Sequence, residues 1–349
     1  MTPTRPRLAG VLLVLAVLAG CDSKPADGPA GQPPTGLAAP VSADSLKNYR
    51  VVSRACQTHD GQPLRVFRTW GKAGEERVLA VNPQTFRTLQ IPAQELTCET
   101  TPGPLAAQVA NSPFARTLAA ATAPPYLPAN HGLTHLPTTQ GRLLFTVDLC
   151  PSKANFDQAF FQRLTEFSQP DTPAGAAPMP APKPVPVALA VSGHWMDHHP
   201  QELAWLQDLA RQGKLAITWV NHTYYHPIWP DEPDEQNFLS DPRVDKARLL
   251  RETLNTEKAM LTRGITPSVF FRFPGLVSRA DHVNTLRELN LIPLGANAWL
   301  SKGELAVDGA IVLLHGNGND PLGIRRAMKL LEQRGKTDGF VSLEDALTN

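Results

Sequence analysis

The chain has 349 residues, of which 42% are hydrophobic, and its 33 basic side chains nearly balance its 32 acidic ones, giving a formal net charge of +1. This length and apolar content are sufficient for a sizeable core, either in two domains or in one barrel-sized domain with additions. The balanced charge provides no basic surface for nucleic acid, so no nucleic-acid partner is predicted.

The first 20 residues have the pattern of a secretory signal peptide. Arg5 and Arg7 precede an apolar run at residues 8–18 that is too short for a stable membrane-spanning helix. The run ends in LAGC, which resembles the lipobox of bacterial lipoproteins, and an ordinary signal peptide with a chance cysteine is the alternative. The lipobox interpretation implies cleavage before Cys21 and acylation of that residue. The protein would then be anchored to a bacterial membrane on its periplasmic or extracellular side.

Residues 21–45 are rich in Pro, Gly and Ala and are predicted to form a flexible tether. Residues 46–100 are predicted to form a small antiparallel β domain, because strand-like runs at 49–56, 63–70, 77–81 and 86–91 are separated by turn sequences. Cys56 and Cys98 bracket this segment and are the predicted disulfide pair of an exported protein. Cys150 is then left unpaired.

The pattern changes at about residue 140, where short apolar strands begin to alternate with amphipathic helices. We predict strands at 143–147, 186–193, 215–220, 268–271, 291–296 and 310–314, and helices at 155–167, 200–213, 241–264, 279–290 and 323–335. Residues 101–139 are assigned as a linker, and the low-complexity stretch 168–186 as a surface insertion. The alternation indicates an α/β fold, with helix-coated parallel strands forming a (β/α) barrel over residues 140–349.

Polar side chains follow four of the predicted strands. Asp148 follows the first strand, His222 and His226 the third, Arg272 the fourth and His315 the last. An isolated aspartate after a strand more often belongs to a turn. Working residues of barrels, however, project from the C-terminal ends of strands, so this shared placement favours a functional site.

The spacing of His222 and His226 predicts two imidazoles on one side of a helical turn, close enough to bind one metal ion. Two ordinary surface histidines are the alternative for this spacing alone, but the position after a buried strand favours a metal site. With an acid, an arginine and a third histidine from other strands, the set matches a metal hydrolase. It would provide a Lewis acid, a base, a charge partner for the base, and an acid for the leaving group.

Several motifs occur in order along this region. TVDLCP at 146–151 is similar to T-F-D-D-G-P, NHTYYHP at 221–227 to N-H-S/T-x-x-x-H-P, RFPG at 272–275 to R-x-P, and LLH at 313–315 to L-x-H. VSGHWMDHHPQELAWL at 191–206 is similar to a second strand and the helix that follows it. Together these motifs, over roughly residues 140–345, resemble the polysaccharide deacetylases, the NodB-homology domain of carbohydrate esterase family 4.

The resemblance implies a distorted (β/α) barrel that removes N-acetyl groups from a glycan with the help of a divalent metal, usually zinc. By position in the motifs, Asp148 corresponds to the catalytic base, Arg272 to the residue that pairs with this base, and His315 to the general acid. His222 and His226 correspond to two metal ligands.

Trp299 and Leu313 resemble the residues that wall the acetyl pocket of the family, with an ordinary core role for the tryptophan as the alternative.

The chain departs from the family pattern at Leu149, which stands where the family has a second aspartate as third metal ligand. Asp148 can ligate directly, His194 or the Cys150 thiolate can substitute, or water can fill the position. On composition alone, Cys150 is favoured as a small buried apolar residue.

The sequence therefore predicts a metal-dependent hydrolase that acts on amide bonds of an extracytoplasmic polysaccharide or other glycan. Two other functions remain open. One is a non-catalytic glycan-binding lipoprotein with a degenerate site, and the other is an amide hydrolase with a non-glycan substrate. No protein partner is inferred.

Overall fold

The computed structural model describes residues 36–72, 74–137, 141–152, 154–167, 184–334 and 339–348. The predicted signal peptide, Cys21 and the tether up to residue 35 lie outside the described residues, as does most of the insertion at 168–186. No helix in the described ranges combines the length and the apolar character needed to cross a membrane.

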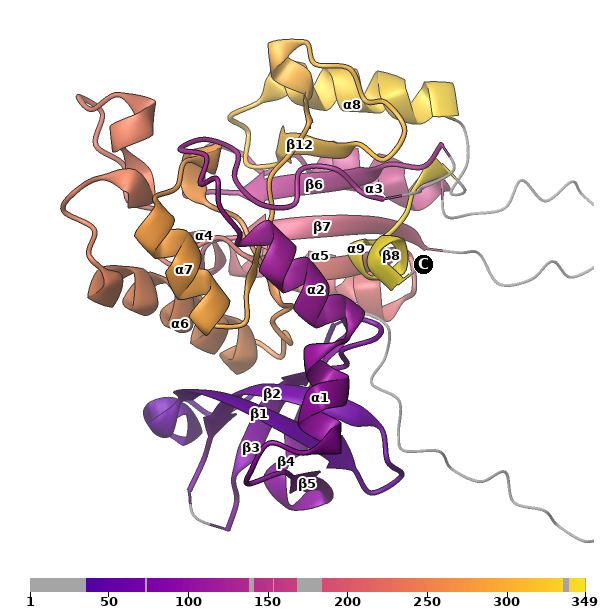
Figure 1. The fold of residues 1–349 in the computed structure, drawn as a ribbon. Coiled ribbons are helices and arrows are strands. Elements are labelled where there is room, and N and C mark those ends of the chain that lie inside the picture. The colour runs from indigo at the N-terminus through magenta and orange to yellow at the C-terminus, as the bar shows by residue number, and fades with distance from the viewer. Residues whose placement is uncertain are drawn as a thin grey trace, which may run out of the picture. The chain divides into compact units, whose positions relative to one another are not determined.

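An antiparallel sheet forms the first part of the described chain (Figure 1). Its strands are β1 (Arg50–Thr58), β2 (Pro63–Trp70), β3 (Arg77–Val81), β4 (Thr88–Pro92) and β5 (Leu96–Cys98), in the order β4-β3-β2-β1-β5. The first four lie within a few residues of the predicted strands, whereas β5 is three residues long and too short to be recognised from its sequence. Cys56 and Cys98 are register partners on β1 and β5 and form a disulfide, which confirms the predicted pair.

Two helices lie in the range that was assigned as a linker, α1 (Pro104–Ala110) and α2 (Pro113–Ala121). Both begin with a proline, and the Ser112 hydroxyl caps α2 by accepting a hydrogen bond from the backbone N–H of Ala115. A serine followed by a proline is a start signal for a helix, so this signal was present in the sequence. The side chains of Phe114 and Leu118 anchor α2 in the core.

The second part of the chain contains a curled parallel sheet, which confirms the predicted α/β class. In the described ranges its strands are β6 (Leu144–Leu149), β7 (Val185–Val191), β8 (Leu215–Asn221), β9 (Phe270–Phe271), β10 (Ile292–Pro293), β11 (Ala298–Trp299) and β12 (Ile311–His315). Their order is β10-β9-β8-β7-β6-β12-β11, so β6 lies in the interior of the sheet between β7 and β12. All neighbouring strands run parallel, and their C-terminal ends therefore meet at one edge.

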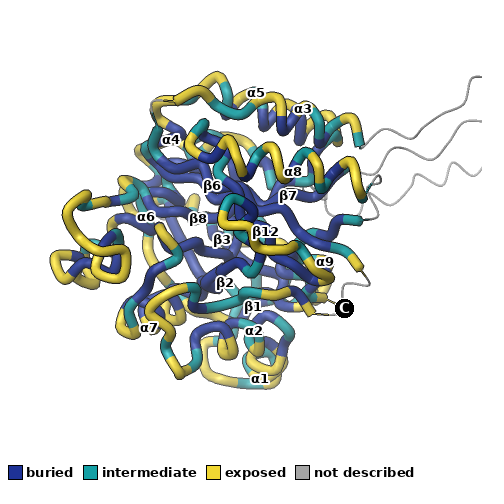
Figure 2. Tube along the Cα trace, turned by 90° about the horizontal axis from the view of Figure 1, so that it is seen from above, coloured by how far each residue is buried: buried dark blue, intermediate teal, exposed yellow. Residues whose placement is uncertain are grey.

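Helices cover the outer face of this sheet, with exposed residues on their outward sides and buried strands beneath (Figure 2). They are α3 (Gln158–Phe167), α4 (Gly193–His198), α5 (Pro200–Arg211), α6 (Lys246–Thr262), α7 (Ala280–Glu288) and α8 (Pro321–Arg334). The last helix, α9 (Leu343–Thr348), instead packs Leu343 and Ala346 into the hydrophobic cluster on the opposite face of the sheet. The two short helices α4 and α9 were not predicted. Each has six residues, which is too few for a helical period to be visible.

The side chains of β6 alternate between two hydrophobic clusters, one on each face of the parallel sheet. Phe145, Val147 and Leu149 lie in the cluster under the helices, whereas Leu144 lies in the cluster on the opposite face. That second cluster also contains Phe67 of β2, so the two sheets share one core. The alternation places Asp148 on the face of the sheet opposite the helix layer.

Candidate active site

Asp148 lies near the C-terminal end of β6 and is only 4% exposed. Its Oδ1 atom accepts a hydrogen bond of 3.3 Å from Nη1 of Arg272, and its Oδ2 atom is 3.7 Å from Nε2 of His222. The guanidinium of Arg272, from another strand, therefore holds the Asp148 carboxylate at the end of a buried strand. This contact explains the position of Asp148 better than a role in a turn. The structure thus brings the predicted base and its predicted partner together.

Arg272 follows β9 and is completely buried. Its Nη2 atom donates to Oγ1 of Thr146 at 2.9 Å and to the backbone oxygen of Gly295 at 3.1 Å. Burial lowers the pKa of this guanidinium, and the charge of Asp148 opposes that effect. These contacts fix the guanidinium in place, and the guanidinium in turn fixes the orientation of Asp148.

The two histidines of the NHTYYHP motif lie in a loop after β8, not on the helical turn that their spacing predicted. Thr223 and His226 adopt left-handed backbone conformations, with φ of 66° and 51°, which a helix does not allow. The carboxylate of Glu252 on α6 holds this loop by accepting hydrogen bonds from the backbone N–H groups of Tyr224 and Tyr225. The histidine rings nevertheless meet, with centroids 4.8 Å apart.

Hydrogen bonding determines which nitrogen of each histidine is available to a metal ion. Nδ1 of His222 donates to the backbone oxygen of Arg272 at 2.9 Å, which leaves the lone pair of Nε2 directed toward the site. Nε2 of His226 is buried and has no hydrogen-bond partner among the described residues. Burial lowers the pKa of both His222 and His226 to about 3, so both rings are neutral, as metal ligands must be.

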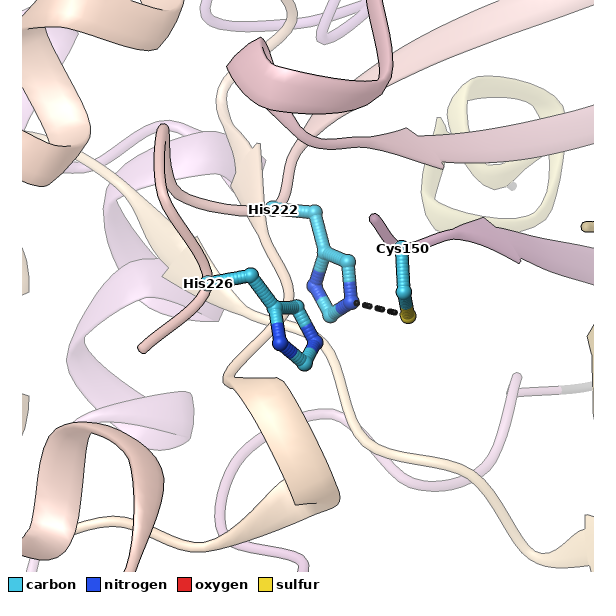
Figure 3. Close-up of side chains that lie close together, drawn as sticks. All are labelled: Cys150, His222 and His226. Atoms are coloured by element: carbon cyan, nitrogen blue, oxygen red, sulfur yellow. Dashed lines mark hydrogen bonds between the residues drawn. The ribbon is translucent and has the colours of Figure 1, made fainter. Parts of the chain in front are cut away.

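Cys150 lies beside the two histidines, and the three side chains point toward one another (Figure 3). Its Sγ atom is 3.3 Å from Nε2 of His222, and one donor atom from each of the three residues lies within 4.8 Å of the others. Burial raises the pKa of the Cys150 thiol well above its usual range, and the charge of Asp148 adds to this. Cys150 is thus buried, as predicted, but it also makes a polar contact with His222 that a purely apolar role does not include. The Cys-His-His cluster is a donor set that can bind a metal ion.

His315, the predicted acid, lies at the end of β12. Its ring centroid is 5.9 Å from that of Trp299, and its Nδ1 atom is 3.8 Å from Oδ2 of Asp320. Burial raises the pKa of the Asp320 carboxyl, but the neighbouring His315 ring and the hydrogen bond from the backbone N–H of Gly323 outweigh burial, and the net pKa is lowered. Asp320 was not predicted from the sequence, although its position five residues after His315 was an available signal.

A pocket of about 430 Å³ opens over these groups. Its lining residues come from several strand ends and loops, and they are Cys150, Pro151, Tyr225, His226, Ile228, Trp299, Ser301, His315, Asn319 and Asp320. Leu313 is the register partner of Trp299 and lies in the hydrophobic core, whereas His194 packs its ring against His198. The pocket thus joins the candidate metal site to the candidate acid.

No protein-family profile matches the sequence. Three solved structures similar to this chain are a family 4 carbohydrate esterase from Bacillus anthracis, the family 4 carbohydrate esterase PdaA from Bacillus subtilis, and a family 4 pseudoenzyme from Bacillus anthracis. All three are members of carbohydrate esterase family 4, which is the family that the motifs resemble. Their identities to this chain are 18%, 16% and 15%, and their TM-scores are 0.44, 0.42 and 0.40.

The first similarity covers 63% of this chain and 89% of the esterase, the second covers 62% and 84%, and the third covers 64% and 70%. At these identities and TM-scores the similarities carry no argument about activity. The function is therefore argued from the residues of the site.

Proposed function

We propose that this protein is a metal-dependent hydrolase that removes N-acetyl or other acyl groups from an extracytoplasmic polysaccharide or glycan. One observation carries the proposal. A carboxylate paired with a buried arginine, two neutral histidines with nitrogens directed into the site, and a third histidine across the pocket gather at the C-terminal edge of one parallel sheet. This set contains the groups that amide hydrolysis requires.

Asp148 would accept a proton from the attacking water, because the Arg272 guanidinium keeps this carboxylate oriented. His315 would donate a proton to the leaving nitrogen, with Asp320 orienting its ring through Nδ1. His222 and His226, with a third donor, would hold the metal, probed first as zinc because nitrogen-rich sites suit that ion. The bound cation would polarise the acyl carbonyl as a Lewis acid.

The side chains at the rim of the pocket support the proposal that the substrate is a glycan. Tyr225 and Ile228 line the pocket and remain 59% and 58% exposed, and the half-buried ring of Trp299 lines it beside His315. An exposed tyrosine ring and a half-buried tryptophan ring next to polar groups suit the apolar faces and hydroxyl edges of sugars. The low net charge of the chain also suits a neutral glycan.

The test combines metal analysis of the purified protein with measurement of acetate release from chito-oligosaccharides. We expect one equivalent of a divalent metal and acetate release that a chelator abolishes and added metal restores. The matched control is the His315→Gln variant, which should keep the metal and lose most of the acetate release. A metal-loaded wild-type protein that releases no acetate from any acylated glycan would contradict the proposal.

A second candidate is a non-catalytic glycan-binding lipoprotein, favoured by the buried Leu149, which has no donor atom where the family pattern has a ligand. It predicts glycan binding without acetate release and without metal. The third candidate, an amide hydrolase for a non-glycan substrate, predicts a metal-loaded protein that hydrolyses simple acetylated amines but not acetylated sugars. The same measurements separate all three.

We further propose that the chain is a lipoprotein anchored through Cys21 to a bacterial membrane, on its periplasmic or extracellular side. The LAGC sequence after a short apolar run supports this. Replacing Cys21 with serine should abolish acylation and release the protein into the soluble fraction. A Cys21→Ser variant that still carries acyl chains and sediments with membranes would contradict it.

A further inference from the structure

The absence of a donor at position 149 follows from the geometry of β6. Leu149 is fully buried in the cluster under the helices, on the same side as Phe145 and Val147. Side chains alternate along a strand, so the next residue, Cys150, returns to the side of Asp148. Its contact with His222 shows this directly.

The positions of the donor atoms suit a common metal ion. With bonds of roughly 2.3 Å to sulfur and roughly 2.0 to 2.1 Å to nitrogen at a tetrahedral angle, the sulfur and nitrogen ligands of one zinc ion are about 3.5 Å apart. Sγ of Cys150 and Nε2 of His222 are 3.3 Å apart. All three donors lie within 4.8 Å of one another, so small side-chain rotations bring them to bonding positions.

The group of mutually close donor atoms consists of Cys150, His222 and His226 and does not include Asp148. The backbone oxygen of Arg272 orients His222, and Nε2 of His226 is buried without a partner in the described part of the chain. Asp148 is instead engaged by the Arg272 guanidinium, which is completely buried and needs a countercharge. Binding of the cation would displace the proton of the Cys150 thiol into solvent. The resulting thiolate carries the same charge as a carboxylate, so Cys150 can replace the missing acid without changing the charge of the metal-bound site.

We infer that the Cys150 thiolate is the third protein ligand of a Cys-His-His metal site, with His222 and His226 as the other two. The sulfur ligand makes the site selective for zinc and cobalt over magnesium and manganese, which prefer oxygen ligands. This inference rests on the proposed function only in taking the site to hold a metal. With Cys150 as the third ligand, Asp148 remains available to accept a proton as the base.

The test is a titration of the metal-free full chain with Co²⁺, followed by absorption spectroscopy. A thiolate ligand gives a sulfur-to-cobalt charge-transfer band that carboxylate, imidazole and water ligands do not give. We expect the band to saturate at one equivalent in the wild type and in the matched control Asp148→Asn. The Cys150→Ser variant should lose the band and bind cobalt ~10²-fold more weakly, as expected for loss of one of a few ligands.

The variant Cys150→Asp keeps a charged donor at the same position and should bind cobalt without the band, which separates loss of sulfur from loss of fold. Circular dichroism of every variant checks its folding. A second measurement needs no variant. Bound Zn²⁺ should slow alkylation of Cys150 by iodoacetamide at least ~10-fold, mapped on its own peptide so that other cysteines do not interfere.

Several results would overturn the inference. They are a wild type that binds cobalt without the band, a folded wild type that binds neither ion, equal affinity in Cys150→Ser, or equal alkylation with and without zinc. Failure of the proposed function is distinguishable, because a protein with the band but no acetate release retains this metal site. Acetate release without the band would refute the cysteine ligand and leave the hydrolase standing.

Discussion

A buried ion pair joins the antiparallel sheet to the helix layer of the parallel sheet. Arg68 on β2 donates from Nε and Nη2 to the two carboxylate oxygens of Glu257 on α6, both at 2.7 Å. The side chains are 0% and 1% exposed. Nη1 of Arg68 donates to the backbone oxygens of Phe67 and Leu289, and the hydroxyl of Tyr49 donates to Glu257.

Removing one partner leaves the other charge buried without compensation. Because neither side chain reaches solvent, we expect Arg68→Met to lower the free energy of unfolding by about 3 to 5 kcal/mol, and Glu257→Leu to have an effect of similar size. The double variant Arg68→Met, Glu257→Leu removes both charges and should be more stable than either single variant. The coupling energy of the pair is the loss of unfolding free energy in the double variant minus the sum of the losses in the two single variants.

Urea unfolding followed by tryptophan fluorescence measures these free energies, since Trp70 on β2 is buried in the shared core. The matched control is Arg50→Met on β1, whose pair with Glu76 is 63% and 42% exposed. Such exposed pairs contribute at most about 1 kcal/mol. An Arg68→Met variant that is no less stable than the control would refute the reasoning, as would a double variant as unstable as the sum of the singles.

Four further predictions concern the site and the helix layer. Asp148→Asn should lower hydrolysis by about 10² to 10⁴-fold with unchanged metal stoichiometry, measured on one preparation, and loss of metal would make Asp148 a ligand. The double variant His222→Ala, His226→Ala should lose its metal but stay folded, and a metal content equal to that of the wild type would remove both residues as ligands. Glu252→Ala removes the hydrogen bonds that hold the loop carrying both histidines, so metal affinity measured by titration should fall about 10 to 100-fold. Unchanged affinity would show that the loop keeps its conformation without Glu252. Burial lowers the pKa of His282 below 6.5, although the charge of Asp281 opposes this shift. The unfolded chain therefore binds a proton at His282 that the folded protein does not bind, and the free energy of unfolding falls as pH decreases below about 6.5. In urea unfolding, His282→Leu should reduce this dependence on pH, and an unchanged dependence would exclude His282 as a contributor.

The larger features of the fold could be predicted from the sequence because hydrophobic periodicity reports burial directly. The runs that became β6, β7, β8 and β12 are continuous and apolar, as expected for strands buried on both faces, and the rule for strand ends brought Asp148 and Arg272 together correctly. What could not be predicted are short elements and the packing between distant segments. The two-residue strand β11 was not predicted, and β9 and β10 form only two residues each of the longer strands predicted at 268–271 and 291–296. The shared core of the two sheets depends on contacts that no local pattern contains.

The backbone of the histidine loop was beyond prediction for a different reason. A spacing of four residues fits a helix, yet the loop reaches a similar separation of the rings through two left-handed residues and an acid, Glu252, that lies 26 residues after His226 in the sequence. The residue types were sufficient to nominate His222 and His226, because the donor atoms define the chemistry. Their geometry depended on tertiary contacts instead.

The assignment of Leu149 and Cys150 shows how a strand decides between neighbouring residues. Matching the motif position by position directs attention to Leu149 and leaves the metal site one ligand short. The alternation along β6 instead assigns Leu149 to the helix layer and Cys150 to the side of Asp148, where its sulfur meets His222. The absence of a donor at Leu149 and the presence of one at Cys150 are therefore connected, because the face of the sheet that each side chain reaches decides both. On this account the site separates its two functions, with the metal held by Cys150 and the histidines and the proton transfer left to Asp148.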